Sequence, residues 1–166
     1  MQSHDLPLEP KKRVPTREEE EAFLSRMRAF LSKQRTLILG TCQESIPSCN
    51  LMSFALMPDS FALIIVSPDN SRKSRALQQN GNVSLLVVDR AALDQDLKAG
   101  TAVTLNGRAR SVADQERLIL ENVFIDRNPS LEAFARSDRS AVFRIDIHHL
   151  VAVTNFQELT ELTLHR

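Results

Sequence analysis

The sequence predicts a mainly β domain in which six antiparallel strands form a closed or split barrel with helices at its rims. From residue 36 onward, short runs rich in Val, Ile, Leu and Thr alternate with polar turns. The first runs are joined by links of only a few residues, and short links favour antiparallel neighbours over βαβ units. The expected strands lie near residues 36–42, 47–56, 60–67, 82–89, 101–112 and 141–154.

Length and composition favour one soluble domain. The chain has 166 residues, of which 42% are hydrophobic and 25% charged. Residues 1–15 carry three prolines and a basic cluster, so we expect a flexible N-terminal arm there and a single domain over residues 16–166.

The charge balance and the apolar runs exclude some classes of partner. Basic and acidic residues number 21 each, so no global positive field attracts nucleic acid. The longest apolar run, near residues 61–66, is far shorter than the roughly 20 residues of a membrane span. We therefore expect a cytoplasmic protein that binds neither nucleic acid nor membrane.

Cysteine and histidine spacing predicts no metal centre. Cys42 and Cys49 form no CxxC motif, and four histidines accompany them. We expect both cysteines to be reduced, buried side chains. Because Trp and Tyr are absent, a ring that stacks on a ligand must belong to Phe or His.

Helix signals surround the expected strands. Thr16 and Glu19 form the pattern of a capping box, and Phe23, Met27 and Leu31 follow at helical spacing, which predicts a helix packed on the barrel. Further helices are expected over residues 71–79, 91–97, 113–122 and 130–135, the last with Asn128 as its cap and Pro129 in its first position.

The segment from Ser67 to Lys73 carries the strongest chemical signal. Ser71, Arg72 and Lys73 follow a buried strand and begin a helix. A helix start presents unpaired backbone amides and partial positive charge, and these residues add a hydroxyl and two cations. An anion site is therefore predicted, although a solvated basic turn would have the same residues.

This segment, with the Asn80–Gly81 turn and apolar strand that follow it, resembles the phosphate-binding segment of the pyridoxamine 5′-phosphate oxidase-like flavoproteins. The resemblance covers roughly residues 23–156 and includes Pro47 early in a hairpin's second strand. It implies a split barrel of the FMN-binding type. It also implies a homodimer that holds FMN at the subunit interface, and an oxidoreductase that uses a small molecule or a nicotinamide as redox partner.

The resemblance also assigns site residues. Ser71, Arg72 and Lys73 would hold the FMN phosphate, the strand over residues 48–53 would lie along the ring and ribityl chain, and residues 101–105 of the partner would complete the site. The candidate cofactor-binding residues are Ser67, Ser71, Arg72, Lys73, Asn50, Leu51, Met52 and Ser53. From strand patterning alone, Asn50 and Ser53 are equally consistent with an ordinary polar face of the strand. The same patterning favours core positions for Leu51 and Phe54.

Departures from the oxidase pattern leave the reaction open. Ala102 stands where the oxidase has a glutamine, and the C-terminal Trp is missing, so we expect a looser relative whose substrate and catalytic residues are unknown. The last strand resembles that of haem-utilisation relatives, which makes haem binding or breakdown an alternative, and flavin binding without turnover is another. His148 and His149 are expected on opposite faces of a strand, and His165 in a frayed terminus.

Overall fold

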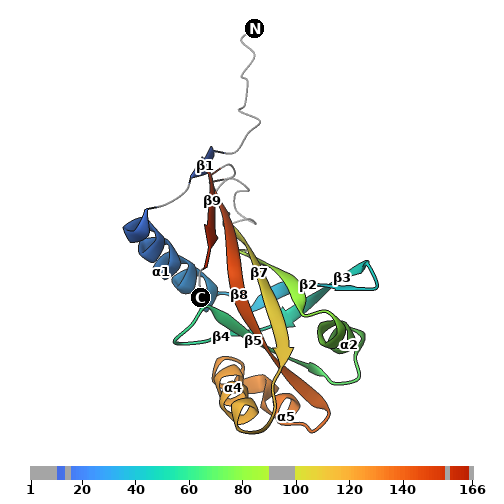
Figure 1. The fold of residues 1–166 in the computed structure, drawn as a ribbon. Helices are drawn as coiled ribbons and strands as arrows, with labels where there is room; N and C mark the ends of the chain where they lie inside the picture. The colour runs from blue at the N-terminus through green and yellow to red at the C-terminus, as the bar shows by residue number, and fades with distance from the viewer. Residues whose placement is uncertain (1–10, 14–15, 90–99, 156–157, 165–166) are drawn as a thin grey trace.

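The computed structural model describes residues 11–13, 16–89, 100–155 and 158–164 (Figure 1). Its strands are β1 (Lys11–Arg13), β2 (Thr36–Gln43), β3 (Ile46–Ser53), β4 (Ala55–Leu56), β5 (Ala62–Pro68), β6 (Asn82–Val88), β7 (Ala102–Ser111), β8 (Ser140–Thr154) and β9 (Glu158–Thr163). Its helices are α1 (Arg17–Lys33), α2 (Arg72–Gln79), α4 (Asp114–Arg127), the 3-10 turn η1 (Pro129–Leu131) and α5 (Glu132–Ala135).

The strands form one curled sheet. Its main path runs β3, β2, β6, β7, β8, β9 and β1, and all neighbours except β1 and β9 are antiparallel. β8 pairs with β5 through residues 140–146 and with β9 through residues 149–154, so one long strand belongs to both halves of the curl. The molecule is a mainly β, split-barrel fold with helices at its periphery, as the sequence predicts.

All six predicted strands are present, and two further strands were not predicted. The second predicted strand divides at Phe54 into β3 and β4. β1 comes from the expected arm and pairs in parallel with β9, in register Lys11 with Glu158. Neither strand has a strong local signal. The three residues of β1 lie at the sheet edge and pair only with β9, whereas β9 pairs with β1 on one side and with β8 on the other.

Helix α1 begins as its sequence predicts. The Thr16 hydroxyl accepts a hydrogen bond from the Glu19 amide at 3.4 Å, and the Thr16 amide donates to Glu19 Oε2 at 2.8 Å. Phe23, Met27 and Leu31 are buried in the core of the curled sheet. The helix predicted over residues 91–97 lies outside the described residues.

Asn128 does not cap the following turn through its side chain. Its amide is buried and donates to the carbonyl oxygens of Phe54 at 3.2 Å and Phe124 at 3.1 Å. Asn128 is nevertheless the N-cap residue of η1 and Pro129 its first residue, as predicted; only the side-chain cap bond is missing, because the buried amide is used between Phe54 and the end of α4. α4 also runs to Arg127, five residues beyond the predicted end at residue 122.

The interior of the curl is packed by aliphatic residues of facing strands. Fully buried examples are Leu37, Leu39, Leu85, Leu105 and Leu150. A second cluster lies between β5 and the α4–α5 end, at the bottom of Figure 1. No described helix combines the length and the apolar character required to cross a bilayer.

Of the residues predicted to be buried, two are on the outside and one is half-buried. Leu51 is 66% exposed, although Phe54 is buried as predicted. Cys49 is exposed and Cys42 half-buried, and both are free thiols. β3 leaves the barrel as a projecting hairpin with β2, so its outward-facing side chains have no cover among the described residues (Figure 1).

Candidate functional site

A cavity of about 300 Å³ lies between the β2–β3 hairpin and the start of α2. The hairpin contributes Gln43, Glu44, Ile46, Ser48 and Asn50, and the helix contributes Arg72 and Lys73. Ile46, Ser48 and Asn50 alternate along β3, so one face of the strand forms the cavity wall. The fold therefore brings Asn50, Arg72 and Lys73 into one site, as the sequence predicts.

Arg72 and Lys73 occupy the first two positions of α2. Cations at this end oppose the helix dipole, and the first amides of a helix have no acceptor within it. Within the described part of the chain, neither side chain is engaged in an ion pair or hydrogen bond. Two cations and free amides at one cavity wall are the groups that bind an anion such as phosphate.

Ser71 and Ser67 build the start of the helix. The Ser71 hydroxyl accepts from the Ser74 amide at 3.2 Å and donates to Ser74 Oγ at 3.0 Å. Ser67 is fully buried, with its hydroxyl 3.0 Å from Ser71 Oγ. The Ser74 hydroxyl then donates to the Pro68 carbonyl at 2.7 Å. This chain of hydroxyls fixes the geometry of the turn that carries Arg72.

The other candidates of β3 lie on different sides of the strand. Met52 continues the cavity-facing row but is buried in the core. Leu51 faces outward and pairs with Ile38 of β2, which pairs in turn with Leu86 of β6. These apolar residues line an outer cavity of about 680 Å³ that has Lys33 and Arg35 among its lining residues.

The hairpin is fastened to α2 by side chains at the end of the helix. Gln43 Nε2 donates to Gln79 Oε1 at 2.9 Å, and Asn80 Nδ2 donates to the Cys42 carbonyl at 3.1 Å. Gln43, Glu44 and Ile46 were not predicted as site residues. The short link between the two strands identified the turn, but no local signal indicates that the hairpin lies over a helix that is some 30 residues away.

A β-bulge changes the expected positions of the two adjacent histidines. Asn106 of β7 pairs with His149 and Gly107 pairs with Ile147, so His148 has no partner on β7. Ile147 and Leu150 both belong to the core, which places His148 and His149 together on the outer face. The predicted opposite orientation was wrong because the extra residue interrupts the alternation of the strand.

The two histidines have different surroundings. His149 Nδ1 is 3.1 Å from Asn106 Nδ2, and its Nε2 is 2.8 Å from Glu161 Oε1. His148 is exposed and lines an outer cavity of about 450 Å³ together with Cys42 and Cys49. In the described ranges, no group of three His, Cys, Asp or Glu side chains is arranged to hold a metal ion. His165 lies outside these ranges.

Comparison with known proteins identifies the family. The sequence profile described as pyridoxamine 5′-phosphate oxidase matches residues 23–153, so the chain belongs to this family. No curated protein matches the sequence.

Solved structures share the fold. A haem-binding protein from Mycobacterium smegmatis aligns with a TM-score of 0.75 at 19% identity, over 91% of this chain and 60% of its own. General Stress Protein 26 from Bacillus anthracis aligns with a TM-score of 0.66 at 21% identity, over 86% and 98%. HutZ, the haem storage protein from Vibrio cholerae, aligns with a TM-score of 0.63 at 17% identity, over 74% and 88%. At these identities the likeness concerns the fold alone.

Proposed function

We propose that the chain is a cytoplasmic FMN-binding flavoprotein, an oxidoreductase that works as a homodimer on a small molecule whose identity is open. The observation that carries this proposal is the cavity between α2 and the β2–β3 hairpin. Arg72 and Lys73 line it from the helix, and Ser48 and Asn50 line it from the hairpin. When bound, FMN would supply the redox chemistry, and a nicotinamide or another small molecule would exchange electrons with it.

The residues of the cavity fit one part of this ligand. Arg72, Lys73 and the first amides of α2 would hold the phosphate, while Ser48 and Asn50 offer hydrogen-bonding groups to the ribityl hydroxyls. Among the remaining candidates, Ser67 and Ser71 would shape the phosphate turn. Leu51, Met52 and Ser53 would contribute through the backbone of β3, because their side chains do not line this cavity.

A second copy of the chain would complete the site. The cavity is at the lower end of the roughly 300–1,000 Å³ typical of cofactor sites, so it accounts for part of the ligand only. On the opposite face of β3 from this cavity, Ile38, Leu51 and Leu86 form an apolar row on the outside of β2, β3 and β6. We propose this outer face as the dimer interface, to which β7 of the partner contributes residues 101–105. The free thiols of Cys42 and Cys49 are compatible with a reducing compartment.

Charge reversal of the phosphate site tests the proposal. The double variant R72E/K73E should weaken FMN binding by roughly 100-fold or more, because two charge-assisted hydrogen bonds are replaced by repulsion. The measurement is quenching of FMN fluorescence during titration with the protein. The control R75E/R139E changes the net charge equally at exposed arginines that do not line the cavity. Unchanged FMN affinity in R72E/K73E would refute the phosphate site.

Haem binding is the second candidate, and the bulge at His148 favours it. This exposed imidazole lies on the outer face beside an open cavity, where it could reach an iron ion, whereas both nitrogens of His149 have partners. An absorbance spectrum of the purified protein separates the candidates. Flavin bands support the first, and a Soret band that is lost in H148A supports the second. Flavin that NADH and NADPH do not reduce would favour a binding protein without turnover.

A further inference from the structure

The proposed phosphate cavity has an acidic member. Arg72 and Lys73 supply two positive charges, and Glu44 supplies one negative charge. The other lining residues are neutral, so the lining residues together have a net charge of +1. A carboxylate beside a bound phosphate opposes its binding, because like charges at close range repel.

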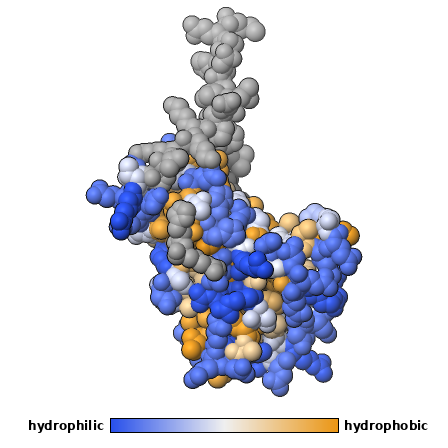
Figure 2. Space-filling view, in the orientation of Figure 1, coloured by the Kyte–Doolittle hydropathy of each residue, from blue (hydrophilic) through white to orange (hydrophobic). Residues whose placement is uncertain are grey.

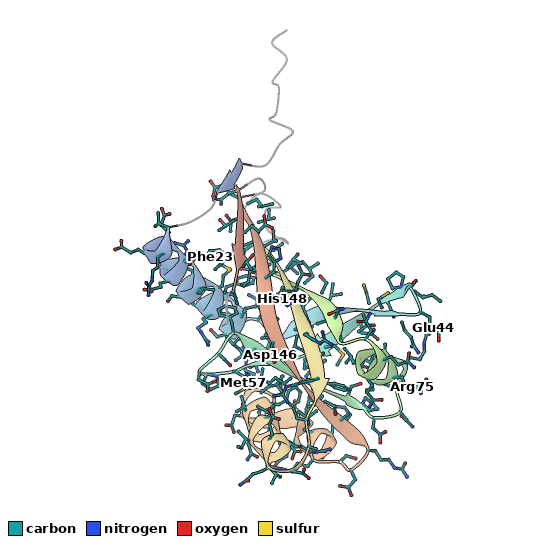
Figure 3. The ribbon with its side chains drawn as sticks, in the orientation of Figure 1. Phe23, Glu44, Met57, Arg75, Asp146 and His148 are labelled. Carbon is teal, nitrogen blue, oxygen red and sulfur yellow. The ribbon has the colours of Figure 1, made fainter. Side chains whose placement is uncertain are left out.

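The backbone keeps Glu44 at the cavity wall. Glu44 and Ser45 form a two-residue turn between the paired residues Gln43 and Ile46, with φ values of 51° and 64°. Both values lie in the left-handed region, as a tight type I′ hairpin turn requires. Figure 3 shows Glu44 at the tip of the hairpin, on the side of the molecule where Arg75 marks α2.

The hydrogen bonds to α2 prevent the hairpin from moving away. Gln43, which precedes Glu44, is bonded to Gln79, and the Cys42 carbonyl is bonded to Asn80. Asn80 is itself fixed, since its Oδ1 accepts from the Asn82 amide at 3.1 Å. Glu44 is therefore held at the cavity wall by the backbone of the hairpin, even though its side chain is exposed to solvent.

We propose that Glu44 is a specificity-determining residue that selects ligands by the charge of their phosphate. It lowers the advantage that a doubly charged phosphomonoester has over a singly charged phosphodiester in a site with two cations. This inference rests on the proposed function, because it requires that the cavity binds phosphate. A phosphomonoester has a second pKa near about 6, so FMN is mainly singly charged at about pH 5 and doubly charged at about pH 7.5.

The test compares three ligand charges on one flavin. Riboflavin has the ring and ribityl chain without phosphate, and FMN adds one or two negative charges according to pH. Glu44→Gln should leave riboflavin affinity unchanged and raise FMN affinity by about twofold at about pH 5 and about fourfold at about pH 7.5, as expected for an exposed charge pair. Glu44→Lys should raise FMN affinity further than Glu44→Gln does, again more at about pH 7.5 than at about pH 5.

Controls isolate the charge of Glu44. Asp126→Asn removes an exposed carboxylate on α4 that does not line the cavity and should change no affinity. In about 1 M salt, the screening length falls to about 3 Å. The ratios of FMN affinity between the Glu44 variants and wild type should then approach one. Thermal melts of each variant check that the hairpin remains folded.

The outcomes separate this inference from the proposed function. If FMN binds better than riboflavin and R72E/K73E loses that difference, but Glu44→Gln leaves FMN affinity unchanged or weakens it, the inference is overturned and the phosphate site stands. An equal change in riboflavin affinity would also overturn it, because Glu44 would then act on the ring or ribityl chain. A protein that binds neither flavin overturns both.

Discussion

At the scale of single residues, Glu121 is unusual because it is a charged residue that is buried. It lies on α4 with 4% of its surface exposed. Its carboxylate accepts from Arg117 Nε at 3.2 Å on its own helix and from Arg136 Nη1 at 3.1 Å at the end of α5. A buried charge remains tolerable only when partners replace the lost water, and here two guanidinium groups do so.

Removing Glu121 should destabilise the protein. In Glu121→Ala, Arg117 and Arg136 lose a shared partner, and we expect a loss of about 2 kcal/mol in the free energy of unfolding, as for hydrogen bonds to a charged group, because both arginines remain partly exposed to solvent. Glu132, which pairs with Arg136 at 2.9 Å but is exposed, provides the matched control Glu132→Ala, which should destabilise the protein much less than Glu121→Ala. Urea unfolding at neutral pH measures both. Equal losses in the two variants would contradict a special role of burial.

The same scale explains the errors about the histidines and Asn128. A bulge at His148 and a buried amide at Asn128 are each decided by one residue's fit among neighbours from other strands and helices. Local sequence contains the residue type but not the acceptor it will meet. The capping box at Thr16 could be predicted because both partners lie within one turn.

At the scale of elements, ion pairs connect β7 to α4. Arg110 of β7 and Glu116 of α4 form a bidentate pair at 2.8 and 2.5 Å. The hydrogen bond from Arg110 lowers the pKa of Glu116 below its ordinary value of 4.5, and the nearby charges of Arg110 and Arg144 act in the same direction against desolvation. The pair joins the sheet to the helix that covers its lower end.

The pH dependence of stability should report this pair. Because the folded pKa of Glu116 is depressed, its contribution is present above the unfolded value of 4.5 and is lost as the pH falls through the folded value. Both side chains are more than a third exposed, so solvent screening limits the contribution to less than about 1 kcal/mol. Urea unfolding of Glu116→Gln should differ from wild type at pH 7, and the difference should disappear as the pH falls below 4.5 and through the depressed folded pKa.

Arg110→Gln supplies the complementary variant for that experiment. It removes the same pair from the other side, so its loss and that of Glu116→Gln should not add in the double variant. Additive losses, or a difference that persists in acid, would show that the pair does not connect β7 to α4 in solution.

At the scale of the whole molecule, the outer face of the sheet has no partner among the residues that the structure describes. Ile38 and Leu51 are 38% and 66% exposed and lie in one row with Leu86. Much of the visible surface in Figure 2 is hydrophilic, with apolar areas between. Exposed apolar rows of this kind mark interfaces more often than free surface.

The proposed dimer predicts a response to charge on this face. Leu51→Glu should shift the protein from dimer to monomer in analytical ultracentrifugation, because a carboxylate would be buried without a partner at the interface. Leu118 on α4 is 57% exposed and offers the matched control Leu118→Glu, which should leave the mass unchanged. A dimer that survives Leu51→Glu but not Leu118→Glu would move the interface to α4.

The sequence by itself determined the class of fold, the helix starts at Thr16 and Ser71, and the positions of six strands. These features depend on caps, alternation and turns that are formed within a few residues of one another. The family resemblance also predicted a shared role for Arg72, Lys73 and Asn50, and these three residues line one cavity.

Only the tertiary structure decided which face of β3 lines that cavity, that Glu44 belongs to its wall, and that His148 and His149 lie on the same side. Each depends on contacts between distant segments, such as the hydrogen bond from Asn80 to the Cys42 carbonyl across 38 residues. Such contacts are selected by the packing of whole elements against each other, and local side-chain patterns do not specify them.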